Sequence, residues 1–331
     1  MSTIRDVAKA AGVSVATVSR VLNQNGYVHE DTRKKVEAAI QELDYTPNEV
    51  ARSLFKKESR LIGLLLPDIT NPFFPELARG VEDEVQAQGY HLLLGNSDEQ
   101  LEKELDYIQT FTKNNVVGFI SATTTEGKAQ YLDVKVPTVF LDRGMKQTYS
   151  VYADGREGGR IAAQQLLLRN SKKITVIRGP VEVEPAQERF QGSMEVLAES
   201  NVEFHVIHTT SFSFQDAQEW AKGLFAAFPD TDGIIASNDI TAAAVLHEAL
   251  LLGKRIPEEV QIIGFDDIPL SRFMFPALST IRQPAYDMGK AAAQLLIGLI
   301  RKKQVGQQSV RLPVAFIERD TTRKVEEEWL K

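Results

Sequence analysis

The chain has 331 residues, 43% of them hydrophobic, and a formal net charge of −7, which is enough material for a large core and at least one further module. It has no cysteine and five scattered histidines, so a disulfide framework, a thiolate metal site and a cysteine nucleophile are excluded, and we expect neither a metal nor a cofactor. Because it lacks both an apolar run of about 18 residues and a signal-like N-terminus, we expect a cytoplasmic protein without a membrane partner.

Residues 1–46 have the apolar spacing of three short helices. Thr3-Ile4-Arg5-Asp6 has the form of a capping box, which predicts the start of the first helix. Gly12-Val13-Ser14 separates it from a second helix over about Val15 to Asn23, and a third begins near Asp31. This order predicts an all-α helix-turn-helix headpiece. Residues 1–60 carry ten Lys and Arg against eight Asp and Glu, whereas the remainder carries 28 against 37, so the headpiece region is the cationic part.

Residues 47–60 are interpreted as a hinge helix and linker. Its helical part, Asn48–Leu54, is shorter than the roughly 12 residues that an isolated helix needs in water. We therefore expect it to form only when another surface supports it.

From Leu61 onward, short apolar runs alternate with helical stretches, which is typical of βα units. The predicted strands are Leu61–Leu66, His91–Gly95, Val116–Ser121, Thr138–Asp142, Ile174–Gly179, Val206–Thr209, Gly233–Ser237 and Val260–Gly264. We expect residues 61–325 to form an α/β core of two similar, doubly wound parallel-sheet subdomains with a cleft between them. The predicted division is 61–158 plus 285–314, and 159–284 plus 315–325.

Two segments carry a family resemblance, namely Gly12-Val13-Ser14-Val15-Ala16-Thr17-Val18-Ser19-Arg20-Val21-Leu22-Asn23 and Tyr45-Thr46-Pro47-Asn48-Glu49-Val50-Ala51-Arg52-Ser53-Leu54. They resemble the headpiece and hinge of the lactose-repressor (LacI/GalR) family. Within it the chain most resembles ribose-operon repressors, and the core is similar to periplasmic ribose-binding proteins. The resemblance implies a transcriptional repressor, not an enzyme, whose homodimer grips a pseudo-palindromic operator.

The resemblance also implies roles for individual headpiece residues. Val15 and Ala16 hold base-reading positions, where small apolar side chains suit thymine methyl groups, and Arg20 suits a guanine. The residues expected on phosphates are Ser14, Thr17, Ser19 and Asn23. Ser14 and Thr17 as simple helix caps, and Arg20 as a solvated charge, remain open alternatives.

Asn48, Ala51 and Leu54 are implied to contact the minor groove, with Leu54 wedged between base steps. The alternative is an ordinary linker that happens to contain a leucine.

Ligands of doubly wound folds bind beyond the carboxyl ends of the strands, and the residues there match the ribose-binding pattern. Those expected to bind hydroxyl groups are Asn71, Asp142, Arg143, Arg189, Asn238, Asp266 and Gln283, and those expected to stack on the sugar are Phe73, Phe74 and Phe212.

Several of these residues have simpler interpretations. Phe73 or Phe74 would serve equally as core aromatics, and Asn71 as a helix cap. Asp142 and Arg143 would also make a local ion pair, and Phe212 competes with Phe214 for its position. Arg178 and Asp154 also approach the expected cleft, without an assignable role.

Other classes of protein fit less well. An exported sugar-binding protein would lack the headpiece, and a nucleotide-dependent enzyme would carry a glycine-rich loop where this chain has Pro67-Asp68-Ile69. The resemblance implies that D-ribose acts as an inducer, and we expect it to close the cleft because its candidate ligands come from both halves. Another sugar, a purine or a phosphoprotein co-repressor remains an alternative effector.

Overall fold

The computed structural model describes residues 2–22, 24–45, 59–123, 134–143, 148–302 and 308–325. They divide into two units, Met1–Ser59 and Arg60–Lys331. Of the expected hinge, 47–60, only Ser59 and Arg60 are among the described residues.

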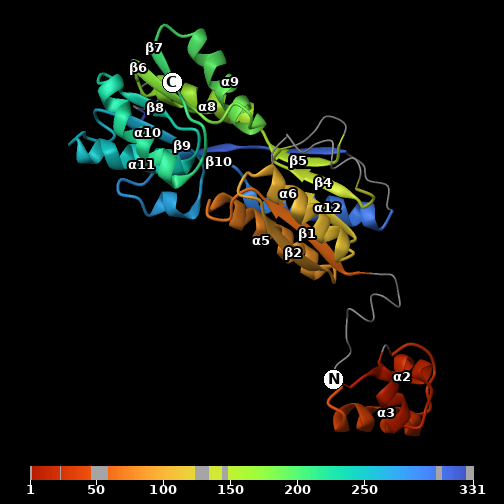
Figure 1. Ribbon diagram of the computed structural model, residues 1–331. Coiled ribbons are helices and arrows are strands. Elements are labelled where there is room, and N and C mark those ends of the chain that lie inside the picture. Colours follow the sequence, from red (N-terminus) through yellow and green to blue (C-terminus); the bar gives the residue numbers. More distant parts are fainter. Residues whose placement is uncertain are drawn as a thin grey trace. The chain divides into compact units, whose positions relative to one another are not determined.

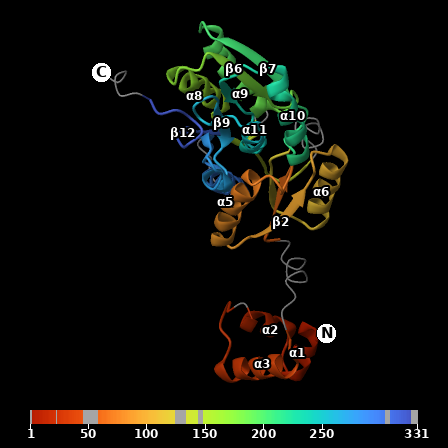
Figure 2. The same cartoon turned by 90° about the vertical axis from the view of Figure 1, so that its left-hand side faces the viewer.

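The first unit is a helical headpiece (Figure 2). Its helices are α1 (Ile4–Ala10), α2 (Val15–Leu22) and α3 (Glu30–Glu42). The capping box at Thr3 and Asp6 is confirmed, because the Thr3 side chain accepts from the Asp6 backbone while the Thr3 backbone N–H donates to Asp6 Oδ2 at 2.8 Å. Gly12, with φ +64°, turns the chain from α1 into α2 at a backbone angle that glycine adopts readily. The buried core of this unit comprises Val7, Ala8, Ala11, Val18, Val21, Val36 and Ala39.

The second unit contains two six-stranded sheets (Figure 1). The first has the order β11-β5-β4-β3-β1-β2, and every pair is parallel. Its strands are β1 (Leu61–Leu66), β2 (His91–Asn96), β3 (Gly118–Ser121), β4 (Thr138–Leu141), β5 (Ser150–Ala153) and β11 (Ser309–Leu312). The covering helices are α5 (Phe73–Ala87), α6 (Leu101–Lys113) and α12 (Ala285–Ile300).

The second sheet has the order β12-β10-β9-β8-β6-β7, in which only the pair β10 and β12 is antiparallel among the described residues. Its strands are β6 (Lys173–Arg178), β7 (Glu203–His208), β8 (Gly233–Ile235), β9 (Gln261–Asp266), β10 (Ser279–Arg282) and β12 (Ala315–Ile317). The accompanying helices are α8 (Gly155–Leu168), α9 (Glu184–Ala198), α10 (Phe214–Ala227), α11 (Asp239–Leu251) and the short 3₁₀ helix η1 (Pro269–Arg272).

The two-sheet α/β core is therefore confirmed, and the described chain crosses between the halves three times. These crossings are Ala153 to Gly155, Arg282 to Ala285 and Leu312 to Ala315. Residues 155–158, which we expected in the first half, belong to α8, and α8 packs against α9 of the second half. The strands β5, β10, β11 and β12 were not predicted, because none of them contains a long apolar run.

No helix of the described segments is long and apolar enough to cross a membrane.

Candidate DNA-binding surface and ligand pocket

The second helix of the headpiece presents its predicted DNA-binding residues away from the core. Val15, Ala16 and Arg20 are exposed, whereas Val18 and Val21 on the same helix are buried. Val15 is 41% exposed, so its side chain is accessible on the outer face of α2.

Ser14 and Thr17 form the N-terminal cap of α2. Ser14 Oγ accepts a hydrogen bond of 3.2 Å from the Thr17 backbone and lies 2.9 Å from Thr17 Oγ1. The capping interpretation is thus confirmed, and phosphate contacts by Thr17 and by the exposed Ser14 stay a prediction. Ser19 is half-buried. The remaining predicted DNA contacts, Asn23, Asn48, Ala51 and Leu54, lie outside the described residues.

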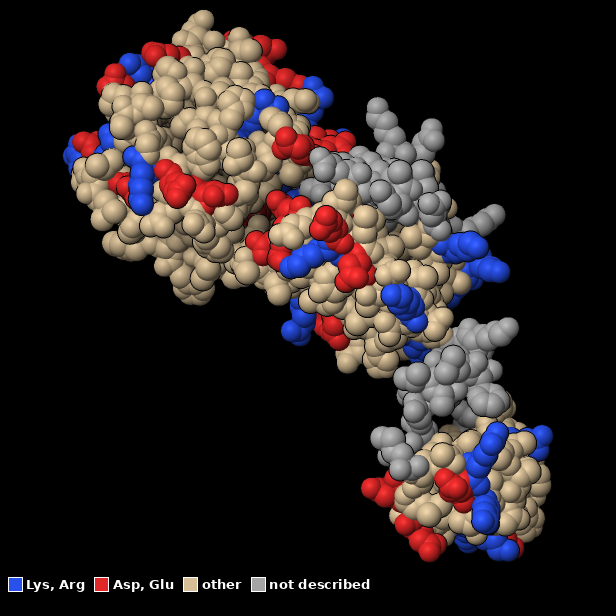
Figure 3. All heavy atoms as spheres, viewed as in Figure 1, with Lys and Arg blue, Asp and Glu red and all other residues tan. Residues whose placement is uncertain are grey.

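On the face shown in Figure 3, most basic side chains of the headpiece gather toward one side and most acidic ones toward the other. Such an uneven distribution allows one side to face phosphates despite the small net charge.

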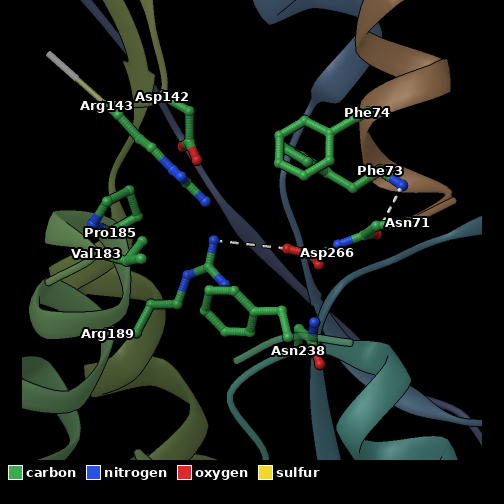
Figure 4. Close-up of a pocket in the computed structure, with 11 residues that line it drawn as sticks. Asn71, Phe73, Phe74, Asp142, Arg143, Val183, Pro185, Arg189, Asn238 and Asp266 are labelled. Atoms are coloured by element: carbon green, nitrogen blue, oxygen red, sulfur yellow. Dashed lines mark hydrogen bonds and ion pairs between the residues drawn. The ribbon is translucent and has the colours of Figure 1, made fainter. Parts of the chain in front are cut away.

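The core contains a pocket at the carboxyl ends of the strands, and both halves contribute to it (Figure 4). It brings together nine of the ten predicted ligand residues. From the first half these are Asn71, Phe73, Phe74, Asp142 and Arg143, and from the second half Arg189, Phe212, Asn238 and Asp266. Val183 and Pro185 complete the lining.

Two asparagines use one end of the amide to shape the backbone. Asn71 Oδ1 accepts from the Phe73 backbone at 3.1 Å, and Asn238 Oδ1 caps α11 by accepting from the Thr241 backbone at 2.8 Å. Each oxygen is thereby fixed, and in Figure 4 the amide nitrogen of Asn71 points toward Asp266. The interpretation of Asn71 as a helix cap is wrong, because Pro72 is the N-cap of α5 and no side chain caps this helix. Asn71 instead shapes the turn before the helix, which leaves its amide nitrogen available as a donor.

Two aspartates stand at the ends of strands with uncommon backbone angles, φ +65° for Asp142 and φ +114° for Asp266. Non-glycine residues with such angles concentrate at functional sites, where the surrounding structure supports the strain. Burial raises the pKa of Asp142, while Arg189 and Arg143 oppose the shift. Burial likewise raises the pKa of Asp266 to about 7, against the influence of Arg189.

Arg189 is held from three directions. Its guanidinium lies 4.0 Å above the Phe265 ring, Nη1 donates to the Ser237 carbonyl at 2.9 Å, and Nη2 is 3.6 Å from Asp266 Oδ1. Its Nε is buried and has no hydrogen-bond partner among the described residues.

Arg143 is 3% exposed and forms an ion pair with Glu99, whose Oε1 lies 3.2 Å from Nη2. The ion pair of Arg143 is thus to Glu99, whereas the sequence suggested Asp142. Its Nε and Nη1 are buried without a partner among the described residues. Buried polar groups are nearly always paired, so donors unpaired beside a pocket point to a ligand with oxygen acceptors.

The aromatic residues line the same space. Phe73 and Phe74 pack edge to face, with ring centroids 5.2 Å apart and an angle of 75°. Both also belong to a hydrophobic core cluster of the first half, so the core interpretation is confirmed, and stacking on a sugar stays a prediction. Phe212 lines the pocket, whereas Phe214 begins α10 and is 51% exposed. Of the two phenylalanines, Phe212 therefore occupies the expected position in the pocket.

Gln283 is not part of the lining but lies behind it, where Nε2 donates to Asp266 Oδ1 at 2.7 Å. This contact gives Gln283 a role in holding Asp266, and its expected contact with a hydroxyl group of the ligand stays a prediction. Asp154 caps α8 and forms an ion pair with Arg311, and Arg178 donates to Gln187.

Val183 and Pro185 were missed by the sequence analysis. They follow β6 at the carboxyl edge, as other lining residues follow their strands, but neither has the hydrogen-bonding or aromatic side chain that a sugar site is expected to offer.

Comparison with known proteins gives consistent matches for both units. A model of bacterial regulatory proteins of the lacI family matches residues 3–48, and a periplasmic binding protein-like domain matches residues 163–322. The chain is 60% identical to the ribose operon repressor of Bacillus subtilis strain 168, over 98% of this chain and 99% of that protein. It is 43% identical to the ribose operon repressor of Lactococcus lactis subsp. lactis, over 99% and 100%.

Two solved structures are similar as well. The lac repressor dimer bound to operator and the anti-inducer ONPF gives a TM-score of 0.88 at 26% identity, covering 97% of this chain and 99% of that one. A LacI family transcriptional regulator from Enterococcus faecium with bound ribose gives 0.71 at 30% identity, covering 79% and 98%.

A helix-turn-helix unit followed by a two-lobed α/β core defines a DNA-binding transcription regulator. With relatives this similar over nearly the whole length, the chain belongs to the lacI family of bacterial regulatory proteins.

Proposed function

We propose that this chain is the repressor of a ribose-utilisation operon in the bacterial cytoplasm. It binds a pseudo-palindromic operator as a homodimer, and D-ribose in the core pocket releases it. The protein acts by binding alone, without a cofactor and without catalysing a reaction. The names of its relatives and the ribose-bound neighbour support this proposal.

The choice of effector rests on one observation, the guanidinium donors that have no partner among the described residues, namely Nε and Nη1 of Arg143 and Nε of Arg189. A pentose supplies oxygen acceptors for these donors, and its hydroxyl groups donate to the carboxylates of Asp142 and Asp266. A buried unpaired donor costs about 1–3 kcal/mol, so a ligand that satisfies these atoms recovers that free energy on binding.

The aromatic side chains provide the apolar surface on which a sugar ring can pack. The C–H faces of a pyranose ring are apolar and pack on Phe73, Phe74 and Phe212, as expected for a ligand site that combines apolar walls with a few oriented polar groups.

The pocket also suggests how the signal reaches DNA. Asn71 and Asp142 come from the first half, and Arg189 and Asp266 from the second, so a sugar bound to all four favours the closed arrangement of the halves. The hinge joins the first half at β1. Movement of the halves in a dimer would therefore change the spacing of the two hinges and weaken operator binding. Because such coupling is reciprocal, the operator must weaken ribose binding by the same factor.

On DNA, Val15 and Ala16 would pack on thymine methyl groups and Arg20 would read a guanine in the major groove. Ser14, Thr17, Ser19 and Asn23 would contact phosphates. Asn48, Ala51 and Leu54 would occupy the minor groove, with Leu54 as the wedge.

Calorimetric titration of the full-length chain with ribose, other pentoses, hexoses and purine bases tests the effector. We expect ribose to bind most tightly. Tighter binding of a purine, or no saturable heat with ribose, would overturn the assignment.

A matched pair of variants tests whether the guanidinium donors of Arg143 bind the ligand. Arg143→Lys removes the donor fork, so it should weaken ribose binding about ten- to a hundredfold. Arg156→Lys, on the exposed face of α8, should leave ribose binding unchanged.

A further inference from the structure

One wall of the pocket offers no hydrogen-bonding side chain. It consists of Val183, which is 4% exposed, and the buried Pro185, which also lacks a backbone N–H. In Figure 4 these two residues lie between Arg143 and Arg189. Asn71 and Asp266 lie on the opposite side of the pocket (Figure 4).

A network of polar contacts holds this wall in place. The Val183 backbone N–H donates to the Pro180 carbonyl at 3.2 Å, and Gln187 Nε2 donates to the same carbonyl at 3.0 Å. Arg178 Nε donates to Gln187 Oε1 at 3.0 Å, and its guanidinium lies 4.6 Å above the Phe190 ring. Gln187 thus ties the end of β6 to the turn that carries Val183.

The shape of a pentose fits this distribution of groups. Ribopyranose carries hydroxyl groups on its first four carbons and none on the fifth. The polar residues attract the hydroxyl-bearing edges and the aromatic rings pack on the two faces, so the remaining hydroxyl-free edge falls to the apolar wall. A hexopyranose with the same hydroxyl arrangement carries an additional hydroxymethyl group at that edge.

We infer that Val183 and Pro185 form a filter that restricts the effector to pentoses, and that Gln187 and Arg178 are positioning residues for this filter. The inference rests on the proposed function, in which the effector is ribose. A hexose would have to bury its hydroxymethyl group against side chains that offer no partner. Apolar walls of this kind discriminate against an extra group by roughly 10–200-fold.

The test compares D-ribose with D-allose, which has the same hydroxyl arrangement plus the hydroxymethyl group, by titration of the full-length chain. The wild type should prefer ribose at least about tenfold. Val183→Ala creates space at the wall, so allose affinity should rise and the preference should fall about tenfold, while ribose affinity changes little. Val181→Ala, two residues away and 52% exposed, is the matched control and should keep the wild-type preference.

Gln187→Met tests the positioning residues, because it removes both the acceptor for Arg178 and the donor to Pro180. The ribose preference should fall in this variant even where its melting temperature matches the wild type, which a purely structural role would not produce.

The outcomes separate the two claims. If the wild type does not bind ribose, both the proposed function and the filter are contradicted. A wild type that binds ribose and allose equally, or an unchanged preference in Val183→Ala with normal ribose binding, overturns the filter alone.

Discussion

Gln283 Nε2 donates a 2.7 Å hydrogen bond to Asp266 Oδ1. Gln283 lies in the segment that crosses from β10 of the second half to α12 of the first, and the preceding residue, Arg282, is opposite Asp266 in the sheet register. The contact therefore connects a pocket carboxylate to a crossing between the halves.

Gln283→Leu should weaken ribose binding by about 1–2 kcal/mol, because the carboxylate loses a donor that orients it and stabilises its ionised form. Since this hydrogen bond lowers the pKa of Asp266, its loss should also move the pH midpoint of ribose binding upward. Titration of the variant at several pH values measures both effects. A weaker affinity with an unmoved midpoint would contradict the positioning role.

Ribose binding should depend on pH through Asp266. Burial raises its pKa to about 7, and Arg189, Asp239, Gln283 and Asp142 are the other groups that act on it. Hydroxyl groups that donate to a carboxylate favour its ionised form, so ribose lowers this pKa and binding releases a proton. Affinity should therefore be highest above pH 7 and fall by up to about tenfold per unit below it.

Calorimetry in buffers of different ionisation enthalpy measures this proton release directly. Asp266→Asn is the control and should flatten the profile. An affinity that stays constant from pH 6 to pH 8 in the wild type would rule out the linkage.

Phe212 should be sensitive to its neighbour Gly179. A Cβ atom at position 179 would lie 2.8 Å from the Phe212 ring and 3.0 Å from Ala186 Cβ, both closer than ordinary contact. Gly179→Ala should displace the ring and weaken ribose binding about tenfold or more, as a loss of packing of about 1–2 kcal/mol. Gly223→Ala on α10, where nothing lies within 4 Å, should bind ribose normally, and equal affinities in the two variants would count against stacking by Phe212.

Arg20→Ala should cost about 1–3 kcal/mol of operator affinity, concentrated at one symmetric base-pair position. Gel-shift titration against operators substituted at each position gives the pattern. The exposed Lys34 of α3, which pairs with Glu30, provides a comparison through Lys34→Ala, for which any loss should be uniform across operators. A uniform loss for Arg20→Ala would make it a phosphate contact.

Long apolar strands made much of the core predictable from the sequence. The run Leu61–Leu66 is recovered as β1 with the predicted bounds, and β8 and β9 lie close to their predicted positions. The short strands β11 and β12, by contrast, are half-exposed or exposed, because each lies at an edge of its sheet. Their assignment depends on neighbours that are distant in the sequence.

Pocket residues could be predicted from the sequence when they have a hydrogen-bonding or aromatic side chain and also lie at the carboxyl end of a predicted strand. Asp142 directly follows β4 and Asp266 is the last residue of β9, at the edge where ligands bind. Gln283 also has a hydrogen-bonding side chain, but this side chain donates to Asp266. That contact depends on the packing and cannot be deduced from the sequence. Val183 shares their position but lacks their chemistry, and so no rule based on polar residues would select it.

In the proposed function, ribose in the pocket controls DNA binding. The direct measurement is the operator affinity of the full-length wild type and of Asp266→Ala, with and without saturating ribose. We predict that ribose weakens operator binding by the wild type, while Asp266→Ala binds operator normally and is not released at that ribose concentration. Unchanged operator affinity of the wild type in saturating ribose would contradict the account and would favour a different effector or a phosphoprotein partner.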